Sequence, residues 1–215
     1  MNIAILIVTA YLIGSIPTAV WVSKWIFGID IREHGSGNAG ATNTFRILGS
    51  KAGTVVMLVD MLKGFLAVKL ALFANLGGLH TEQSVNLQIF LGLFAVLGHI
   101  FPIWAEFRGG KGIATLFGMI LAIQPQVAVS MVGVFVLMLY MTRYLSLSSI
   151  TASIAFPIMI VFIFREPELS YRIFAIATAC LVVLTHHKNI NRLLNGSESK
   201  VAIFRKRRFR RRKDD

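Results

Sequence analysis

Residues 35–46 form a short polar segment between two long apolar runs, and their types suit the binding of an anion. Glycines let backbone N–H groups approach an anion closely, hydroxyl and amide side chains add neutral hydrogen bonds, and arginine supplies a planar fork of charged donors. The residues that supply these groups are Gly35, Ser36, Gly37, Asn38, Gly40, Thr42, Asn43 and Arg46. We name this segment motif 1 and expect a loop that binds a phosphate or a carboxylate.

Gly35, Gly37 and Gly40 also fit the G-x-G-x-x-G pattern of dinucleotide-binding proteins, with Asp60 as a candidate ribose-binding acid. That pattern needs a preceding strand in a soluble βαβ unit, whereas long apolar helices are expected here on both sides. A dinucleotide site is therefore disfavoured. A plain glycine-rich turn between membrane helices remains the simpler alternative, although it does not explain the amide, hydroxyl and guanidinium groups.

A second glycine-rich segment lies directly before the apolar run 113–123. It contains Gly109, Gly110, Lys111 and Gly112, which we name motif 2. A glycine-rich turn at a helix N-terminus offers free N–H donors and the positive end of the helix dipole, and Lys111 adds a full charge. It is not a Walker A loop, because no serine or threonine follows the lysine. Loop charge at the cytoplasmic side of a membrane would explain the lysine but not the glycines.

Residues 186–198, which we name motif 3, follow the last apolar run. His186 and Asn189 are three residues apart and would share one face of a helix, where a histidine can act as a general base or hold a hydroxyl group. An amphipathic tail lying on the lipid would suit Leu193 and Leu194. That alternative does not explain His186, Asn189 and Glu198.

Composition indicates an all-α, polytopic integral membrane protein. Of 215 residues, 55% are hydrophobic and 15% charged, and mean hydropathy is +0.69, unlike an ordinary soluble domain. Residues 3–27 are long enough to span and lack a cleavage pattern, so they are expected to remain as the first helix. No metal-binding cluster is visible, and Cys180, alone in an apolar run, is expected to be buried.

The apolar runs predict membrane helices at residues 3–27, 52–75, 85–104, 113–123, 127–141, 145–164 and 171–185. The first contains Gly14 and Pro17, which favour a kink with close helix packing. Whether Pro125 kinks one helix or separates two decides between six and seven spans. The run 113–123 is short and needs tilting or burial against its neighbours.

Seven spans with the N-terminus outside place most loop arginines and lysines and the C-terminus in the cytoplasm, as the positive-inside rule favours. Six spans would separate motif 3 from motifs 1 and 2. Residues 1–204 are therefore expected to form one transmembrane domain, followed by a basic cytoplasmic tail, 205–215. Much of the net charge of +12 lies in that tail, for which attraction to anionic lipid is a simpler account than nucleic acid.

Three groups inside the apolar runs leave two interpretations open. Asp60 and Lys63 are three residues apart on one helical face, so they form either a mutual ion pair or a functional site. His99, near the end of its helix, is more often a structural hydrogen-bonding residue than a ligand or a base.

Taken together, the motifs resemble the bacterial acyl-phosphate glycerol-3-phosphate acyltransferases, the PlsY family. The similarity rests on motif 1, on motif 2 with Ala114 and Thr115, and on motif 3, and residues 60–64 resemble the family's second helix. The matching positions of motif 3 are His186, Asn189, Ile190, Arg192, Leu193, Leu194, Gly196 and Glu198. Two departures are Thr185, where many members have arginine, and Lys188, where glutamate or glutamine is common.

The resemblance implies acyl transfer from acyl phosphate to the sn-1 hydroxyl of glycerol 3-phosphate, giving lysophosphatidic acid and phosphate. It implies catalytic roles for five residues. Ser36, Arg46 and Lys111 would bind the phosphates, and His186 and Asn189 would position the attacking hydroxyl. The remaining expected substrate-binding residues are Gly37, Asn38, Gly40, Thr42, Asn43, Gly109, Gly110, Gly112, Thr115 and Glu198. We expect no cofactor, no metal and no nucleic acid, with membrane lipid as a partner and a monomer in the bacterial inner membrane.

Two rivals come from other functional classes. A small transporter or flippase for an anionic lipid would share broken helices and intramembrane charges. No repeat relates the two halves, however, and the polar motifs cluster at one predicted membrane face. A lipid scaffold acting through the basic tail is the other. Such a scaffold would lose its function on truncation after Lys200, which an acyltransferase would largely tolerate.

Overall fold

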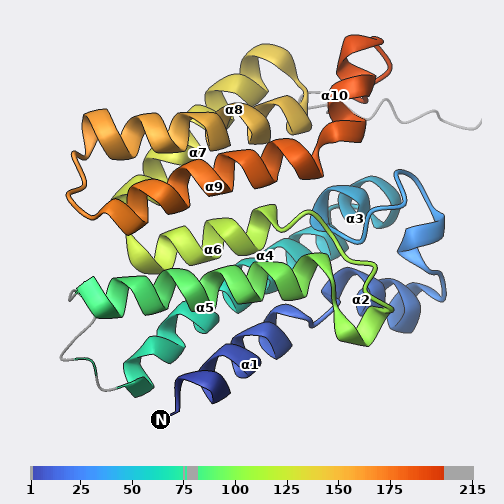
Figure 1. Ribbon diagram of the computed structural model, residues 1–215. Coiled ribbons are helices and arrows are strands. Elements are labelled where there is room, and N and C mark those ends of the chain that lie inside the picture. Colours follow the sequence, from blue (N-terminus) through green and yellow to red (C-terminus); the bar gives the residue numbers. More distant parts are fainter. Residues whose placement is uncertain (1, 75, 77–81, 201–215) are drawn as a thin grey trace, which may run out of the picture.

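The computed structural model describes residues 2–74, 76 and 82–200. The basic tail 205–215 and the expected helix end at residue 75 lie outside this part of the chain. Every regular element within it is helical, which confirms the expected all-α class. The longer helices run side by side, with α3 (Ala41–Leu48) and α10 (His187–Leu194) at one end of the bundle (Figure 1).

The first expected helix is divided where the sequence predicts a kink. Helix α1 (Ile3–Gly14) and α2 (Thr18–Phe27) are separated at Pro17, and together they form a 25-residue apolar span. A Cβ atom at Gly14 would lie 2.1 Å from the Ala95 carbonyl oxygen. The glycine therefore lets α1 pack directly on α5 (Glu82–Ile100).

Motif 1 is a loop only in its first half. After Gly40 the chain turns into α3, and α4 (Ser50–Lys69) follows one residue after it ends, continued by the 3₁₀ turn η2 (Leu70–Ala74). The expectation of a loop through Arg46 was wrong, because no glycine or proline interrupts residues 41–48. Both the amide and the hydroxyl of Thr44 donate to the Gly40 carbonyl in the first turn.

Pro125 separates two helices. Gln124 has extended backbone between α6 (Ile113–Ile123) and α7 (Pro125–Thr142), and Pro125 occupies the first turn of α7, where its missing N–H has no cost. Helix α8 (Leu145–Ile158) continues into a π-helical turn, η4 (Met159–Ile163), just after its internal Pro157. Helix α9 (Leu169–Thr185) then leads to α10 across a 62° bend.

In the described residues four spans are long and apolar enough to cross a membrane, or five if α9 and α10 count as one. These are Ile3–Phe27, Glu82–Ala105, Pro125–Thr142 and Leu145–Ile163. Helix α6 is too short, yet most of its residues are buried against α4 and the surrounding core. The expected burial of this short helix against its neighbours is therefore present, whereas its crossing of a membrane stays a prediction.

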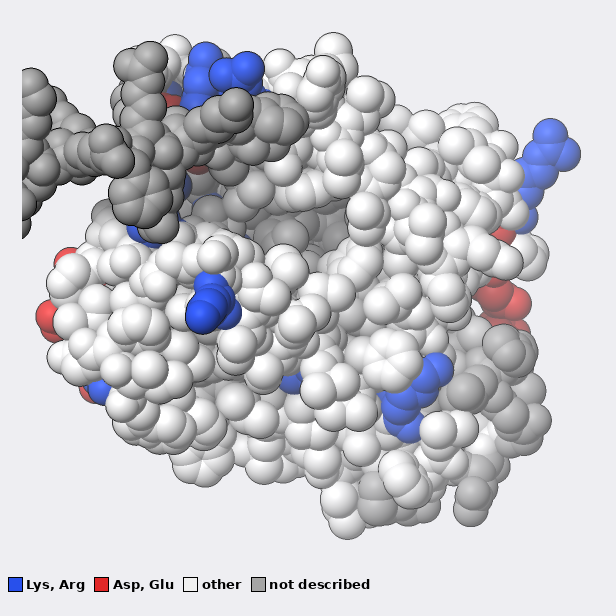
Figure 2. All heavy atoms as spheres, turned by 180° about the vertical axis from the view of Figure 1, so that it is seen from behind, with Lys and Arg blue, Asp and Glu red and all other residues white. Residues whose placement is uncertain are grey.

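The outer surface of the bundle is apolar. Exposed side chains such as Val8, Leu62 and Leu137 lie on three different helices, and the face seen in Figure 2 is largely uncharged and hollowed in its upper half. Cys180 is exposed on α9, so the expectation that it is buried was wrong. In a membrane protein an apolar run faces lipid as readily as it faces the core.

Candidate functional site

Motif 1 is held in shape by the side chain of Asn43. Its Oδ1 accepts a hydrogen bond from the Ser36 amide at 3.0 Å, and its Nδ2 donates to the carbonyls of Ile31 and His34. Asn43 is 1% exposed. Gly35 and Gly37 have positive φ of 63° and 72°, which favours glycine at both positions. The loop therefore presents the exposed residue Ser36 from a backbone fixed by Asn43.

Arg32, which the sequence did not single out, joins the segment before motif 1 to the segment before motif 2. Arg32 binds Asp30 at 2.8 Å and donates to the Ala105 carbonyl at 3.0 Å. The hydrogen bond from Arg32 holds the pKa of Asp30 well below its usual range. In the sequence, only Asp30, two residues before Arg32, suggested an ion pair. The hydrogen bond from Arg32 to the Ala105 carbonyl depends on the fold.

Motif 2 lies directly on the end of α5. The amides of Gly109 and Gly110 donate to the carbonyls of Ile100 and His99, both at 3.1 Å. A Cβ atom at Gly110 would lie 2.2 Å from His99 Nε2, and one at Gly109 would lie 2.0 Å from the His99 carbonyl oxygen. These two glycines permit the close approach of the loop, and their N–H groups are engaged with the protein. Gly112, with φ of 79°, begins α6.

Lys111 connects motif 2 to motif 3. Its Nζ donates to Asn189 Oδ1. The Asn189 amide donates in turn to Glu198 Oε1 at 2.7 Å. Glu198 also accepts hydrogen bonds from Ser146 at 2.7 Å and from Arg192 at 2.6 Å, so its two oxygens orient other side chains. Together these bonds lower the pKa of Glu198 although burial acts to raise it.

The environment of Lys111 destabilises its protonated, charged form. Burial lowers its pKa to about 8, the carboxylate of Glu198 acts to raise it, and the nearby cations of Arg192 and Arg46 act to lower it. Arg46, exposed on α3, thus lies within electrostatic range of Lys111. The site carries an excess of positive charge, which suits a doubly charged phosphate.

His186 lies at the bend between α9 and α10 and is 3% exposed. Its Nδ1 is 2.8 Å from the Val182 carbonyl oxygen, which can only accept, so Nδ1 carries the proton. Burial, and then the charge of Lys111, lower its pKa to about 4. His186 is therefore neutral near pH 7, with Nε2 able to accept a proton or a hydrogen bond.

The structure thus brings one residue of motif 1, one of motif 2 and several of motif 3 together at one end of the bundle. They are Arg46, Lys111, His186, Asn189, Arg192 and Glu198. Thr115 lies elsewhere, with its backbone in the contact between α4 and α6. Ser146, on α8, joins the network without any motif to mark it.

The described residues contain no group of three or more His, Cys, Asp or Glu side chains that could hold a metal ion. A cavity of about 470 Å³ is lined by residues including Lys69, Gln124 and Tyr171, but by none of the motif residues. It is therefore not part of the candidate site.

Comparison with known proteins agrees with this geometry. The family model described as glycerol-3-phosphate acyltransferase matches residues 4–196. A glycerol-3-phosphate acyltransferase of Bacillus subtilis (strain 168) is 45% identical over 201 residues, 94% of this chain and 98% of that protein. One of Enterococcus faecalis is 42% identical, with 94% of each chain covered.

The fold also matches solved structures. The crystal structure of PlsY, an integral membrane glycerol 3-phosphate acyltransferase, in its glycerol 3-phosphate form superposes with a TM-score of 0.82 at 38% identity. It covers 93% of this chain and 95% of that one. The lysophosphatidic acid form gives a TM-score of 0.79 at 37% identity, with 92% and 94% covered. The chain therefore belongs to the glycerol-3-phosphate acyltransferase family.

Proposed function

We propose that the protein transfers a fatty acyl group from acyl phosphate to the sn-1 hydroxyl of glycerol 3-phosphate, giving lysophosphatidic acid and inorganic phosphate. The observation that carries this assignment is the hydrogen bond from Lys111 to Asn189. It joins a cation suited to phosphate with the motif that holds His186. The family relationship and the solved structure with glycerol 3-phosphate support an enzyme and not a transporter.

In the proposed reaction the sn-1 oxygen attacks the carbonyl carbon of the acyl phosphate. The new carbon–oxygen ester bond forms, the bond from that carbon to the phosphate oxygen breaks, and phosphate leaves with the electron pair. The hydroxyl proton goes either to His186 Nε2 or to a phosphate oxygen. Because a mixed anhydride has a good leaving group, no covalent enzyme intermediate is required.

We assign Lys111, Arg46 and Ser36 to the phosphates and His186 with Asn189 to the attacking hydroxyl. Glu198 orients other side chains and does not contact the substrate directly in this proposal, because its oxygens already accept hydrogen bonds from Ser146, Asn189 and Arg192. Gly109 and Gly110 of motif 2 likewise have a positioning role, since their amides already donate hydrogen bonds to carbonyls of α5. The acyl chain would lie along the uncharged hollow visible in Figure 2.

We further propose seven crossings, with the N-terminus outside and the site on the cytoplasmic face of the bacterial inner membrane. Helices α4 and α6 would then cross as well, covered partly by their neighbours. The alternation of chain direction along the bundle in Figure 1 supports this topology. Residues 1–204 would act as one domain and as a monomer, with 205–215 as a lipid-facing basic tail.

The donor is tested by supplying purified protein in lipid with labelled glycerol 3-phosphate and one of three palmitoyl donors. We expect labelled lysophosphatidic acid with palmitoyl phosphate and none with palmitoyl coenzyme A or palmitoyl acyl carrier protein. Equal product from a thioester would overturn the assignment of the donor. No product from any donor, with folded protein, would overturn the proposed reaction.

A further inference from the structure

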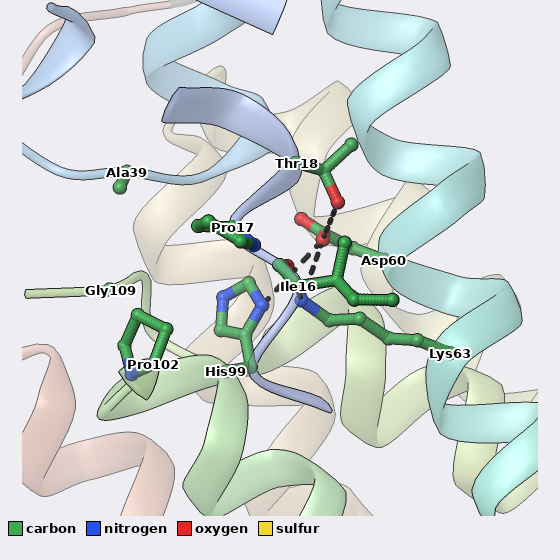
Figure 3. Close-up of a pocket in the computed structure, with 9 residues that line it drawn as sticks. All are labelled: Ile16, Pro17, Thr18, Ala39, Asp60, Lys63, His99, Pro102 and Gly109. Carbon is green, nitrogen blue, oxygen red and sulfur yellow. Dashed lines mark hydrogen bonds and ion pairs between the residues drawn. The ribbon is translucent and has the colours of Figure 1, made fainter. Parts of the chain in front are cut away.

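A buried charged cluster lies beneath the place where motifs 1 and 2 meet (Figure 3). Asp60 and Lys63, both on α4, form an ion pair of 2.9 Å and are 1% and 3% exposed. Asp60 also accepts a hydrogen bond from Thr18 at 3.1 Å, and Lys63 donates to the Ile16 carbonyl at 3.0 Å. The ion pair therefore fixes the break between α1 and α2 against α4.

The same cluster reaches α5 through His99. Its Nδ1 lies 3.7 Å from Asp60 Oδ1, so the carboxylate faces the ring without a direct hydrogen bond. Figure 3 shows the ring between Asp60 and the backbone of Gly109. Ala39, from motif 1, lines the same cavity of about 10 Å³. Groups from both motif loops thus border the cluster.

His99 is also the surface on which motif 2 lies. A Cβ atom at Gly110 would be 2.2 Å from His99 Nε2 and 3.1 Å from the Ala39 carbonyl oxygen. Gly109 and Gly110 both donate to backbone carbonyls at this end of α5. Since Lys111 is the next residue, a change in the orientation of the His99 ring moves the start of the Lys111 side chain.

We propose that Asp60, Lys63 and His99 are positioning residues that hold the motif 2 loop, and thereby Lys111, without touching substrate. This inference rests on the proposed part of Lys111 in the reaction. A charged pair specifies one orientation of its neighbours, whereas an apolar replacement of similar size fills the same space without directing the histidine. A positioning role accounts for the buried charges of Asp60 and Lys63 on α4 beside motif 2.

The pH dependence of the reaction distinguishes positioning from simple stability. Lys111 faces Glu198, Arg192 and the neutral His186 of motif 3, and Arg46 of α3. Burial is the largest cause that lowers its pKa to about 8. If the loop loosens, Lys111 becomes more hydrated, its pKa rises, and the alkaline limb of kcat/KM moves to higher pH.

The first experiment replaces both members of the ion pair, Asp60→Leu with Lys63→Met, so that no unpaired charge remains buried. We expect kcat/KM to fall at least tenfold and the alkaline limb to move upward by at least half a pH unit. A folded double variant with the wild-type limb and kcat/KM within twofold of wild type would overturn the proposal. If kcat/KM of the wild-type enzyme shows no alkaline limb that depends on Lys111, the proposed role of Lys111 in the reaction is overturned instead.

A second experiment remains informative if that variant does not fold. Gly110→Ala should collide with the His99 ring and lose most activity. Adding His99→Ala removes the collision and should restore at least fivefold over Gly110→Ala alone, but not the wild-type activity, because the positioning ring is then missing. Gly133→Ala is the matched control, since a Cβ atom there meets nothing within 4 Å. No restoration in a folded double variant would show that the ring does not carry the effect to Lys111.

Discussion

Lys111 donates a hydrogen bond to Asn189 of motif 3. Its partial burial is the largest cause that lowers its pKa to about 8. The charged form, which we propose binds phosphate, predominates below that pH. Asn189, the acceptor, is itself held by Glu198. Asn189 thus positions Lys111, and Glu198 positions Asn189.

The first prediction concerns the wild-type enzyme. As pH rises through about 8, Lys111 loses its proton, so kcat/KM for acyl transfer should fall with an apparent pKa near that value. The measurement is kcat/KM for glycerol 3-phosphate between pH 6 and pH 10, with acyl phosphate as the donor. A plateau that extends to about pH 10, where a hydrated lysine titrates, would contradict a buried Lys111.

The second prediction concerns Glu198→Gln. The negative charge of Glu198 acts to raise the pKa of Lys111, so its removal should move the alkaline limb to lower pH. Asn189 would also lose a charged acceptor, so the rate should fall about tenfold or more, as for loss of a charge-assisted hydrogen bond. Glu168→Gln, at a half-buried position outside the three motifs, serves as the control. A limb that stays in place or moves upward would contradict the assigned network.

The sequence predicted several of the residues that lie together at the candidate site, but not the hydrogen bonds between them. Clusters of glycine, arginine and lysine beside apolar runs already indicated anion binding. The hydrogen bonds of Asn43 to three nearby backbone groups depend on the folded shape of residues 31–43. The bond from Ser146 to Glu198 depends on the packing of segments distant in sequence. Periodicity and composition carry no information about such partners.

At the scale of elements, the contact between α4 and α6 places the charged cluster beside motif 2. Their backbones approach at two glycines. A Cβ atom at Gly64 would lie 2.1 Å from the Thr115 carbonyl oxygen, and one at Gly118 would lie 1.9 Å from that of Met61. Any side chain at either position must push the helices apart.

The third prediction follows from this contact. Gly118→Ala should destabilise the folded protein by roughly 1–3 kcal/mol through overpacking. Gly133→Ala, in an open position of α7, should be neutral or stabilising by up to ~1 kcal/mol because alanine favours helix. Thermal unfolding in detergent, followed by circular dichroism, compares the two. An equal melting temperature for both variants would contradict the close packing of α4 on α6.

Helix positions were largely predictable because apolar runs and prolines mark them. The break at Pro17, the short helix at 113–123 and the separation at Pro125 all appear where expected. Helix α3 was missed because polar residues and glycines in motif 1 indicated a loop. The π-helical turn after Pro157 was missed because it arises within an otherwise uninterrupted apolar run.

At the scale of the whole molecule, an apolar exterior surrounds a bundle whose polar motifs meet at one end. Arg32 joins the segment before motif 1 to that before motif 2, and Lys111 joins motif 2 to motif 3. A six-span topology was expected to separate motif 3 from the others. Its contact with Lys111 supports the proposed seven crossings.

The fourth prediction tests that topology by labelling. In a Cys180→Ser background, Asn2→Cys should react with a membrane-impermeant maleimide in spheroplasts, and Ser197→Cys should react only after permeabilisation. Cys180 must be removed because it is exposed on α9. Reaction of both cysteines from the same side would mean an even number of crossings and would contradict the proposal.

The most direct test of the central claim is phosphate release by purified protein in lipid, supplied with palmitoyl phosphate and glycerol 3-phosphate. Release should require both substrates and match lysophosphatidic acid one for one. It should fall at least a hundredfold in Lys111→Ala, as for the loss of one preorganised donor at about 3 kcal/mol, and persist in Lys51→Ala, an exposed lysine of α4. Release that ignores glycerol 3-phosphate, or an undiminished rate in Lys111→Ala, would contradict the account.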